Sequence, residues 1–424
     1  MNKKLLKKLV LVVVIVIIII IVFILKIDDI KINYLWNNTV KISLQDKCWE
    51  KEHAYNAGST LQIPLHYAFT EGDIEKQKQF KKQFKEFDID KYIKEYKINQ
   101  LDKLQYMYLV SRYLVLECNE KSNNNVQLAN KMMKLIYKMW DNPIDNWNLV
   151  GLKNMGKSIE WKIHNKEVER SYYRAITDIE LYVLAISCDL QYYFKINGNI
   201  DNENKLKYIT KYVNYIFDSE IKYVDDKIWY FQADVWSEHP DYLYATYDEI
   251  KEHLKPIPVK NIVMDSSHYS RFPLWLVSFR EIQDEEYRKK YSKLLDDLSH
   301  TFISKVLVVP TDDFKLYRTK NYMNGINGLF RYNYMNKGNN YAHKPYSLGT
   351  FYLGWWKFTD TKEIDNIYKS ISKISFPMSL KYRNSYTTFD KNNYENFVKG
   401  SMVYPYVLNN GYAELISLLK YNNK

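Results

Sequence analysis

The chain has 424 residues, which is enough for one large domain or two domains of ordinary size. It carries 61 Lys and Arg against 50 Asp and Glu, for a formal net charge of +11. Its three cysteines, Cys48, Cys118 and Cys188, exclude a disulfide framework and form no CxxC metal motif. The last two fall in predicted apolar helices, so we expect them to be buried free thiols.

The N-terminus combines a basic segment with a long apolar one. Four lysines lie within residues 1–8, and an uninterrupted apolar run occupies residues 9–25. A run of about 17–25 apolar residues matches the bilayer core, whereas a cleaved signal peptide has a shorter apolar region and a small-residue cleavage site. The pattern predicts a cytoplasmic basic tail at 1–8 and a transmembrane signal anchor at 9–25. This would be a single-pass protein of the cell membrane with its main domain outside the cytoplasm.

The net positive charge of the chain indicates which partners it could bind. An excess of positive charge outside the cytoplasm suits acidic partners, such as uronate or teichoic polymers and anionic headgroups. The predicted compartment, rather than the charge, argues against nucleic acid. A basic surface that is merely solvated is the alternative.

The next two segments differ in character. Residues 27–70 are mixed in composition and are predicted to form a neck and a first wrapping segment, with a short strand at 39–44. Residues 71–99 are charged and carry phenylalanines at helical spacing, which predicts a surface helix that buries one aromatic stripe.

Helical pairs follow from about residue 100. Apolar residues recur in steps of three and four, as at Leu128, Met132, Leu135 and Met139. In each pair an apolar, aromatic helix ends in a short polar turn, and a more charged helix returns. The predicted pairs are 102–117 with 126–140, 171–195 with 205–218, 271–282 with 286–305, and 347–358 with 363–374. One more apolar helix is predicted at 411–420.

These pairs predict a mostly α fold. Short turns within pairs and long loops between them indicate stacked helical hairpins over residues 71–424, closed into an (α/α) toroid behind the transmembrane helix. The apolar helices would line the inside of this toroid. An open solenoid is the alternative.

Two phrases carry a family resemblance. YYFKINGNIDNENKLKYI at 192–209 and LGWWKFTDTKEIDNIY at 353–368 are similar to hairpin turns of the six-hairpin (α/α) toroid superfamily of glycosidases, polysaccharide lyases and uronate epimerases. The resemblance is architectural and covers roughly residues 60–420. It implies a central cavity whose mouth is covered by the loops between hairpins, and an activity on carbohydrate.

Four long connections separate the pairs, at 141–170, 219–270, 306–346 and 375–410. Connections of this length inside a globular domain are usually functional or disordered, and their Trp, Tyr, Arg and His content argues against disorder. The second one runs into the polar segment 265–271 (DSSHYSR) at the start of an apolar helix. Unpaired backbone N–H groups and the helix macrodipole favour anions at such a place.

The candidate catalytic residues come from the second connection and this polar segment. They are His268, Asp265, Tyr269, His239, Glu238 and Asp241. His268 would be a general base whose tautomer is fixed by Asp265, three residues earlier. A structural histidine that caps the following helix is the alternative.

The candidate substrate-binding residues are cationic, aromatic or amide side chains near the same loops. They are Arg271, Trp229, Trp236, Tyr242, Asn327, Arg331, Tyr332 and His343. Arg271 would clamp a carboxylate through its planar fork, unless it is used in an internal ion pair. The tryptophans would stack on sugar faces, unless they cap the core.

No cofactor is expected. The chain has no phosphate-binding glycine loop, GxSxG elbow or HExxH motif. A divalent metal held where these acids and histidines converge is a lesser alternative, because their spacing matches no standard zinc or calcium loop.

The resemblance and these residues together suggest an enzyme acting on an acidic polysaccharide or cell-envelope glycan. A lyase or C5-epimerase would abstract a proton next to a carboxylate, with Tyr269, Arg271, Asn327 and Tyr332 assisting His268. A glycoside hydrolase would instead pair Asp265 with Glu238 or Asp241. A glycan-binding or envelope-assembly protein without catalysis is the third alternative, because fold does not determine function.

Overall fold

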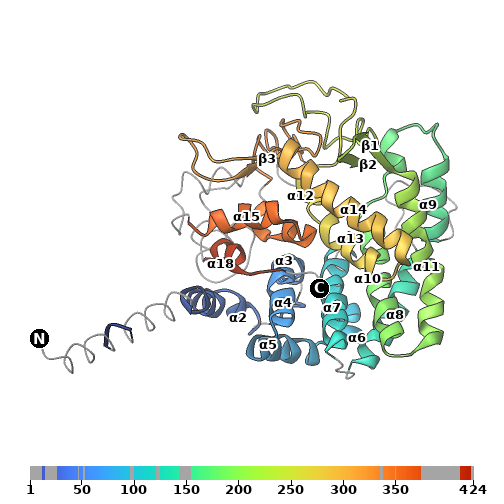
Figure 1. The fold of residues 1–424 in the computed structure, drawn as a ribbon. Coiled ribbons are helices and arrows are strands. Elements are labelled where there is room, and N and C mark those ends of the chain that lie inside the picture. The colour runs from blue at the N-terminus through green and yellow to red at the C-terminus, as the bar shows by residue number, and fades with distance from the viewer. Residues whose placement is uncertain are drawn as a thin grey trace, which may run out of the picture.

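The computed structural model describes residues 12–14, 26–45, 47–50, 53–95, 100–120, 125–142, 154–334, 338–348, 350–373 and 411–421. Over these residues the chain is mostly helical (Figure 1). Of the segments predicted as long connections, 375–410 lies wholly outside the described part of the chain, and 141–170 does so only at 143–153. The described remainder of 141–170 contains helix α9 (Met155–His164), which the prediction of a connection missed.

The helices of the N-terminal half are α2 (Val40–Ser43), α3 (Ala54–Thr60), α4 (Gln62–Thr70), α5 (Ile74–Lys85), α6 (Ile89–Glu95), α7 (Gln100–Asn119), α8 (Val126–Asp141), α9 (Met155–His164), α10 (Asp178–Ile196) and α11 (Ile200–Ser219). Those of the C-terminal half are α12 (Ser266–Tyr269), α13 (Phe272–Glu281), α14 (Glu285–Thr301), α15 (Lys362–Ile371) and α18 (Tyr412–Leu418). Shorter helical turns are η1 (Ser171–Arg174), η2 (Phe302–Val306), η3 (Thr350–Leu353) and η4 (Trp355–Thr359).

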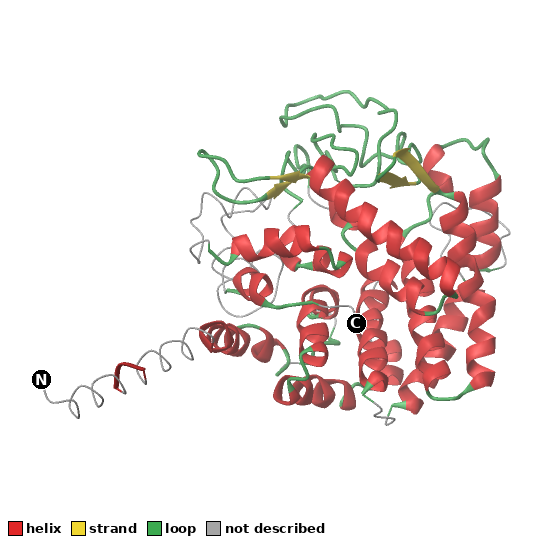
Figure 2. Cartoon of the chain, in the orientation of Figure 1, coloured by secondary structure: helices red, strands yellow, loops and turns green. Residues whose placement is uncertain are grey.

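The predicted helical pairs are present. They correspond to α7 with α8, α10 with α11, α13 with α14, and the short η3 and η4 turns with α15. Helix α10 packs against both α7 and α13 as well as its own partner α11. It is buried along almost its whole length, whereas α11 buries only one face. The mostly helical fold, which Figure 2 shows, is therefore confirmed. The alternation is confirmed by the burial of α10 and α13 along most of their length and by the partly buried α11 and α14.

Local sequence explains where these helices begin. Thr177 and Glu180 form a reciprocal capping box at the start of α10, and the Asp284 carboxylate caps α14 by accepting from the backbone N–H of Tyr287 at 3.0 Å. Asn199 caps α11 in the same way. Each cap satisfies a backbone donor that would otherwise lack a partner.

The segment predicted as a neck differs from expectation in two ways. The predicted strand at 39–44 is wrong, because this stretch contains helix α2. Helices α3 and α4 are buried and pack against α7. Residues 54–70 therefore belong to the helical body, because Leu61, Ile63 and Leu65 join its core.

The predicted transmembrane anchor is also corrected. No helix among the described residues combines the length and the apolar character needed to cross a membrane. The two 20-residue helices, α7 and α11, carry charged side chains that the bilayer core disfavours. Of the range 9–25 the structure describes only Val12–Val14, and the tail at 1–8 lies outside the described residues. The single-pass placement at the cell membrane is accordingly withdrawn.

Loops and two small hairpins cover one end of the helices (Figure 2). Strand β1 (Ile221–Asp225) pairs antiparallel with β2 (Ile228–Phe231), and β3 (Leu307–Val308) pairs antiparallel with β4 (Arg318–Thr319). Isolated bridges join Asp265 to Tyr322 and Phe330 to His343. Of these pairings, the Asp265–Tyr322 bridge joins the second long connection to the third, at the start of α12.

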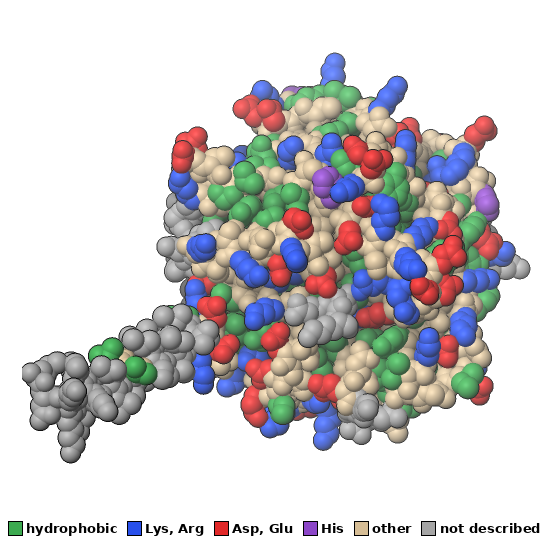
Figure 3. All heavy atoms as spheres, in the orientation of Figure 1, with side chains coloured by type: hydrophobic (Ala, Val, Ile, Leu, Met, Phe, Trp, Pro, Cys, Tyr) green, Lys and Arg blue, Asp and Glu red, His purple; other side chains and the backbone are tan. Residues whose placement is uncertain are grey.

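Two composition-based expectations can be compared with the structure. All three cysteines are buried and form no disulfide with one another, as expected for Cys118 and Cys188. The face shown in Figure 3 intersperses Lys and Arg with Asp and Glu, without one large patch of a single sign. On that face, the net positive charge of the chain is not concentrated into an extended basic surface.

Candidate functional site

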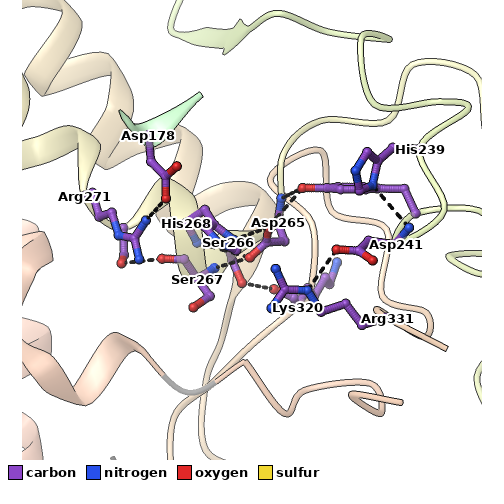
Figure 4. A network of polar contacts seen from close by, with 12 residues as sticks. Asp178, His239, Asp241, Asp265, Ser266, Ser267, His268, Arg271, Lys320 and Arg331 are labelled. Carbon is purple, nitrogen blue, oxygen red and sulfur yellow. Dashed lines mark hydrogen bonds and ion pairs between the residues drawn. The ribbon is translucent and has the colours of Figure 1, made fainter. Parts of the chain in front are cut away.

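Asp265 and His268 form a close pair at the start of α12 (Figure 4). Asp265 caps this short helix, and its Oδ1 accepts from the backbone N–H groups of Ser267 and His268 at 3.1 Å each. Its Oδ2 lies 2.6 Å from Nδ1 of His268. The local spacing, in which the cap and the third residue after it share one turn, is what brings the imidazole to the carboxylate.

The surroundings of Asp265 keep it ionised. Its side chain is fully buried, and burial by itself raises the pKa of a carboxyl group. Contacts with His268 and the nearby positive charge of Arg331 outweigh that effect and hold the pKa of Asp265 well below its usual range. The Tyr242 hydroxyl also donates to Oδ2 at 3.0 Å. Because an ionised carboxylate only accepts, Nδ1 of His268 carries the proton in this pair.

A pocket of about 210 Å³ lies beside this pair. Its lining comes from the start of α10, from two loops and from α12, and consists of Thr177, Asp178, Trp236, His239, Asp241, Tyr242, Met264, His268, Phe330 and Arg331. The side chain of His268 is 26% exposed. Its Nε2 makes no hydrogen bond with any residue that the structure describes, so this nitrogen is available at the pocket.

Arg331 and Asp241 form an ion pair in the pocket wall. Arg331 Nε donates to Oδ2 of Asp241 at 2.9 Å, and its backbone N–H donates to the Asp241 carbonyl at 3.0 Å. Burial lowers the pKa of Arg331, but the negative charges of Asp241 and Asp265 more than offset this and raise it. Within the described residues the two terminal nitrogens of Arg331 make no hydrogen bond. They therefore remain available to an anion.

The expected carboxylate clamp, Arg271, is used inside the protein. It forms an ion pair with Asp178 and donates to the Tyr55 hydroxyl at 3.0 Å. These contacts tie together the starts of α13, α10 and α3. Figure 4 shows the Arg271–Asp178 pair. The structure thus favours the internal ion pair for Arg271. The arginine in the pocket lining is Arg331, which pairs with Asp241 through Nε and packs its guanidinium on Phe330 and Tyr334.

His239 has the opposite hydrogen-bonding polarity to His268. Its Nδ1 accepts from the backbone N–H of Asp241 at 3.2 Å, so its proton resides on Nε2. Burial lowers the pKa of His239, which favours the neutral ring. One pocket is therefore lined by two imidazoles, one with a bare Nε2 and one with an Nε2–H.

Several predicted residues are absent from the pocket lining, and Tyr269, Trp229 and Glu238 are three of them. Tyr269 is fully buried, stacks on Phe272 and accepts from the backbone N–H of Phe231 at 3.1 Å. Trp229 is also fully buried, and its Nε1 donates to the Leu294 carbonyl. Tyr269 and Trp229 are therefore core residues.

Glu238 is the third of these residues. Its carboxylate accepts from the backbone N–H of Ser171 at 2.7 Å and holds η1 in place. It is absent from the pocket lining, unlike its neighbours His239 and Asp241.

The residues predicted from the third connection mostly organise its loops. The Asn327 side-chain oxygen accepts from the backbone N–H groups of Asn321 and Tyr346, at 3.1 Å each. Tyr332 is buried and donates to the Lys251 carbonyl at 2.7 Å. His343 pairs through its backbone with Phe330, and burial lowers its pKa to about 4.

The sequence analysis missed part of the pocket. Asp178 and Thr177 line it because α10 begins there. The Thr-x-x-Glu capping box at 177–180 marks this start in the sequence, so the helix start, and with it Thr177 and Asp178, could have been predicted from it. Phe330 had no such signal, because its place depends on the bridge to His343.

Neither metal-binding groups nor similarity to known proteins assign a function to this site. Across the described ranges, no three or more His, Cys, Asp or Glu side chains gather in a way that could hold a metal ion. Comparisons of the chain with protein-family models, with curated proteins and with solved structures find no match. The fold and the pocket define a helical protein with a loop-covered polar site, and its function has to be argued from that site.

Proposed function

We propose that this protein is an enzyme that abstracts a proton next to a carboxylate in an acidic, uronate-containing saccharide, as a lyase or a C5-epimerase does. The observation that carries the proposal is the 2.6 Å contact between His268 Nδ1 and the buried Asp265 carboxylate. This contact leaves the other ring nitrogen of His268 as a base beside a pocket that also contains an arginine with unused donors.

The base in this proposal is His268. Its Nε2 would take the proton from the carbon next to the substrate carboxylate, and Asp265 would stabilise the imidazolium that forms. Arg331 would pair with the substrate carboxylate and offset the charge that develops on it. In this role Arg331 replaces Arg271.

The acid in this proposal is the His268 imidazolium that forms when the proton is abstracted. In an elimination it would pass this proton to the leaving oxygen, which returns His268 to its starting state, and in an epimerisation water would protonate the opposite face of the carbon. His239 lines the same pocket with a ring that burial keeps neutral, so it would help to position the substrate and would not give up its proton. Tyr269 has no part in this scheme because it is buried in the core.

A glycoside hydrolase is the less favoured candidate. It needs one carboxyl group held protonated and a second one available as base or nucleophile. Asp178 and Asp241 both line the pocket, but each is engaged in an ion pair with an arginine. Asp265 is ionised and bound to His268, so it is a poor proton donor.

The scaffold of the proposal is the six-hairpin (α/α) toroid. Two features support it: α10 packs between α7 and α13, and the starts of α3, α10 and α13 meet at Arg271. Both are expected of parallel inner helices in a toroid whose site lies at one rim.

The test uses the full chain and a panel of uronate polysaccharides. Ultraviolet absorbance of unsaturated products would identify a lyase, and deuterium incorporation at C5 in heavy water would identify an epimerase. Release of reducing ends without absorbance would identify a hydrolase and contradict the proposal.

The matched variants in this test are two histidine-to-alanine changes. We expect His268→Ala to lower turnover by about 10²–10⁴-fold, and His300→Ala, at an exposed position on α14, to retain it. Equal turnover in the wild type and the His268→Ala variant refutes the assignment of the base. Saccharide binding without any turnover would instead support a glycan-binding protein.

A further inference from the structure

Arg318 has a guanidinium group to which the protein supplies no acceptor. This residue begins strand β4 in the third long connection, and its guanidinium carbon lies over the rings of Phe314 and Tyr346, 4.4 and 4.3 Å from their centroids. Its Nε is buried without a hydrogen-bond partner. The two terminal nitrogens also make no hydrogen bond with any residue that the structure describes, but they are not among the buried atoms. Stacked rings leave the N–H groups unused, because these point outward in the plane of the guanidinium.

The other arginines show what Arg318 lacks. Every other arginine that is at least partly buried in the described part of the chain donates to an acceptor within the protein, namely Arg112, Arg174, Arg271, Arg280 and Arg331.

Arg331 is the most informative comparison. Its guanidinium also lies over two rings, those of Phe330 and Tyr334, and its Nε donates to Asp241 at 2.9 Å. Arg318 has the same aromatic surroundings without the carboxylate. A cation that is partly removed from water loses hydration that nothing in the protein replaces here, so we expect its acceptor to come from a ligand.

The backbone of Tyr346 holds its ring beside Arg318. Tyr346 has a φ of 64°, a left-handed conformation that residues other than glycine adopt only at a cost in free energy. The Asn327 side-chain oxygen supports this conformation by accepting from the Tyr346 N–H at 3.1 Å. Asn327, which the sequence suggested as a substrate-binding residue, therefore shapes the surroundings of Arg318.

Arg318 is also close to the candidate site along the chain. Tyr322, four residues later, is bridged to Asp265, the partner of His268. Four residues of chain span at most about 14 Å, so the backbone of Arg318 lies within about that distance of the bridge. An oligomeric ligand of a few units can therefore reach both Arg318 and the pocket.

From these observations we infer that Arg318 is a second anion subsite, whose terminal nitrogens bind an oxyanion of the same polymer that places its reacting unit in the pocket beside His268. The inference rests on the proposed function for the identity of that oxyanion, a uronate carboxylate. It adds a binding residue and a requirement for chain length, because two linked contacts raise the affinity for an oligomer above that for one unit.

The test is calorimetric titration of the full-length protein with free galacturonate and mannuronate, with their hexamers, and with a glycerol phosphate teichoic polymer. We expect at least one hexamer to bind about tenfold or more tightly than its single sugar. Arg318→Gln should weaken hexamer binding by about tenfold and leave the binding of the single sugar unchanged. Arg331→Gln, in the pocket, should weaken the binding of both.

Two further variants are compared with these. Arg318→Lys keeps the charge without the planar fork, so it should recover only part of the hexamer affinity. Arg288→Gln, at an exposed position on α14, is the matched control and should leave every affinity unchanged. An unchanged affinity of Arg318→Gln for the single sugar shows that its pocket is still folded.

The outcomes separate this inference from the proposed reaction. Equal polymer binding by the wild type and Arg318→Gln, including no binding by either, overturns the inference, and so does an equal loss for hexamer and single sugar. Arg318-dependent binding of the teichoic polymer alone supports the anion subsite and contradicts the uronate substrate of the proposed function. Arg318-dependent binding of a hexamer that is not turned over supports the subsite and contradicts the proposed reaction.

Discussion

Replacing Asp265 with asparagine tests the centre of the site with little change in size. The carboxylate accepts two backbone hydrogen bonds through Oδ1, and through Oδ2 it accepts from His268 Nδ1 and the Tyr242 hydroxyl. In the variant the amide oxygen can retain the two backbone donors, which turns the amide N–H₂ toward Nδ1. Two donors then face each other, so His268 has to move its proton to Nε2.

The structure indicates the size of the effects. A base with its proton on the wrong nitrogen cannot accept another, and the same substitution in the Ser-His-Asp triad lowers kcat by about 10⁴-fold. Hydrogen bonds to a charged group contribute about 1.5–3 kcal/mol each. Because Asp265 is fully buried and two such bonds are lost, we expect the free energy of unfolding to fall by about 3 kcal/mol or more.

The pH dependence of stability provides a second signature of this residue. The folded state holds the pKa of Asp265 below its unfolded value. The stability that the carboxylate contributes is therefore present above about pH 4 and is lost as the pH falls below that value. Asparagine does not titrate, so the difference in unfolding free energy between wild type and variant should narrow in acid.

The assays are nitrogen-15 NMR of the histidine rings, which reports the tautomer, and urea unfolding at pH 7 and pH 3. Asp226→Asn, at an exposed position beside the β1–β2 turn, is the matched control and should change neither result. A His268 tautomer that is unchanged in the Asp265→Asn variant would refute the hydrogen-bond argument. A stability difference of equal size at both pH values would refute the charge argument.

Three further predictions concern stability. Burial and the charge of Arg331 lower the pKa of His343 from 6.5 to about 4, so this residue contributes stability that is present above pH 6.5 and is lost as the pH falls toward 4. The His343→Phe variant should not show this loss, which should amount to about 3 kcal/mol of unfolding free energy in urea. A variant with the same pH profile as the wild type would contradict the prediction. Gly328→Ala would place a Cβ 1.9 Å from the Ala245 carbonyl oxygen, so thermal unfolding should show a loss of about 1–3 kcal/mol, and a loss under about 0.5 kcal/mol would contradict the packing argument. Arg112→Met would leave the buried Asp189 carboxylate without its cation, so chemical denaturation should show a loss of about 3–5 kcal/mol, and equal midpoints would contradict the expectation.

Much of the helical architecture was predictable because its signal is local. Leu206, Ile209, Val213 and Ile216 recur at helical spacing, and all four are buried on α11. The alternation of apolar and charged helices likewise indicated which helices would be inner and which outer. The N-terminal segment was predicted less well. Its hydropathy favoured a membrane anchor that no described helix supports, and the predicted strand at 39–44 contains a helix.

The site was predictable to the extent that its contacts are short in sequence. The cap residue Asp265 and His268 are three positions apart, so the sequence alone could pair them, and the structure contains that contact. Their catalytic role stays a prediction. Trp229 and Tyr269 were misplaced because an aromatic residue in a loop pattern looks the same whether it faces solvent or closes the core.

The sequence by itself determined the helical pairs, the cap at Asp265 and the neighbouring imidazole, because each depends on residues within a turn or two of one another. Only the tertiary structure decided which arginine is available at the pocket. Asp178 lies 93 positions before Arg271 and takes it into an internal pair, while Arg331 reaches Asp241 across 90 positions and keeps its terminal nitrogens unused. Pairings over such distances depend on how the helices and loops pack, and no local pattern encodes them.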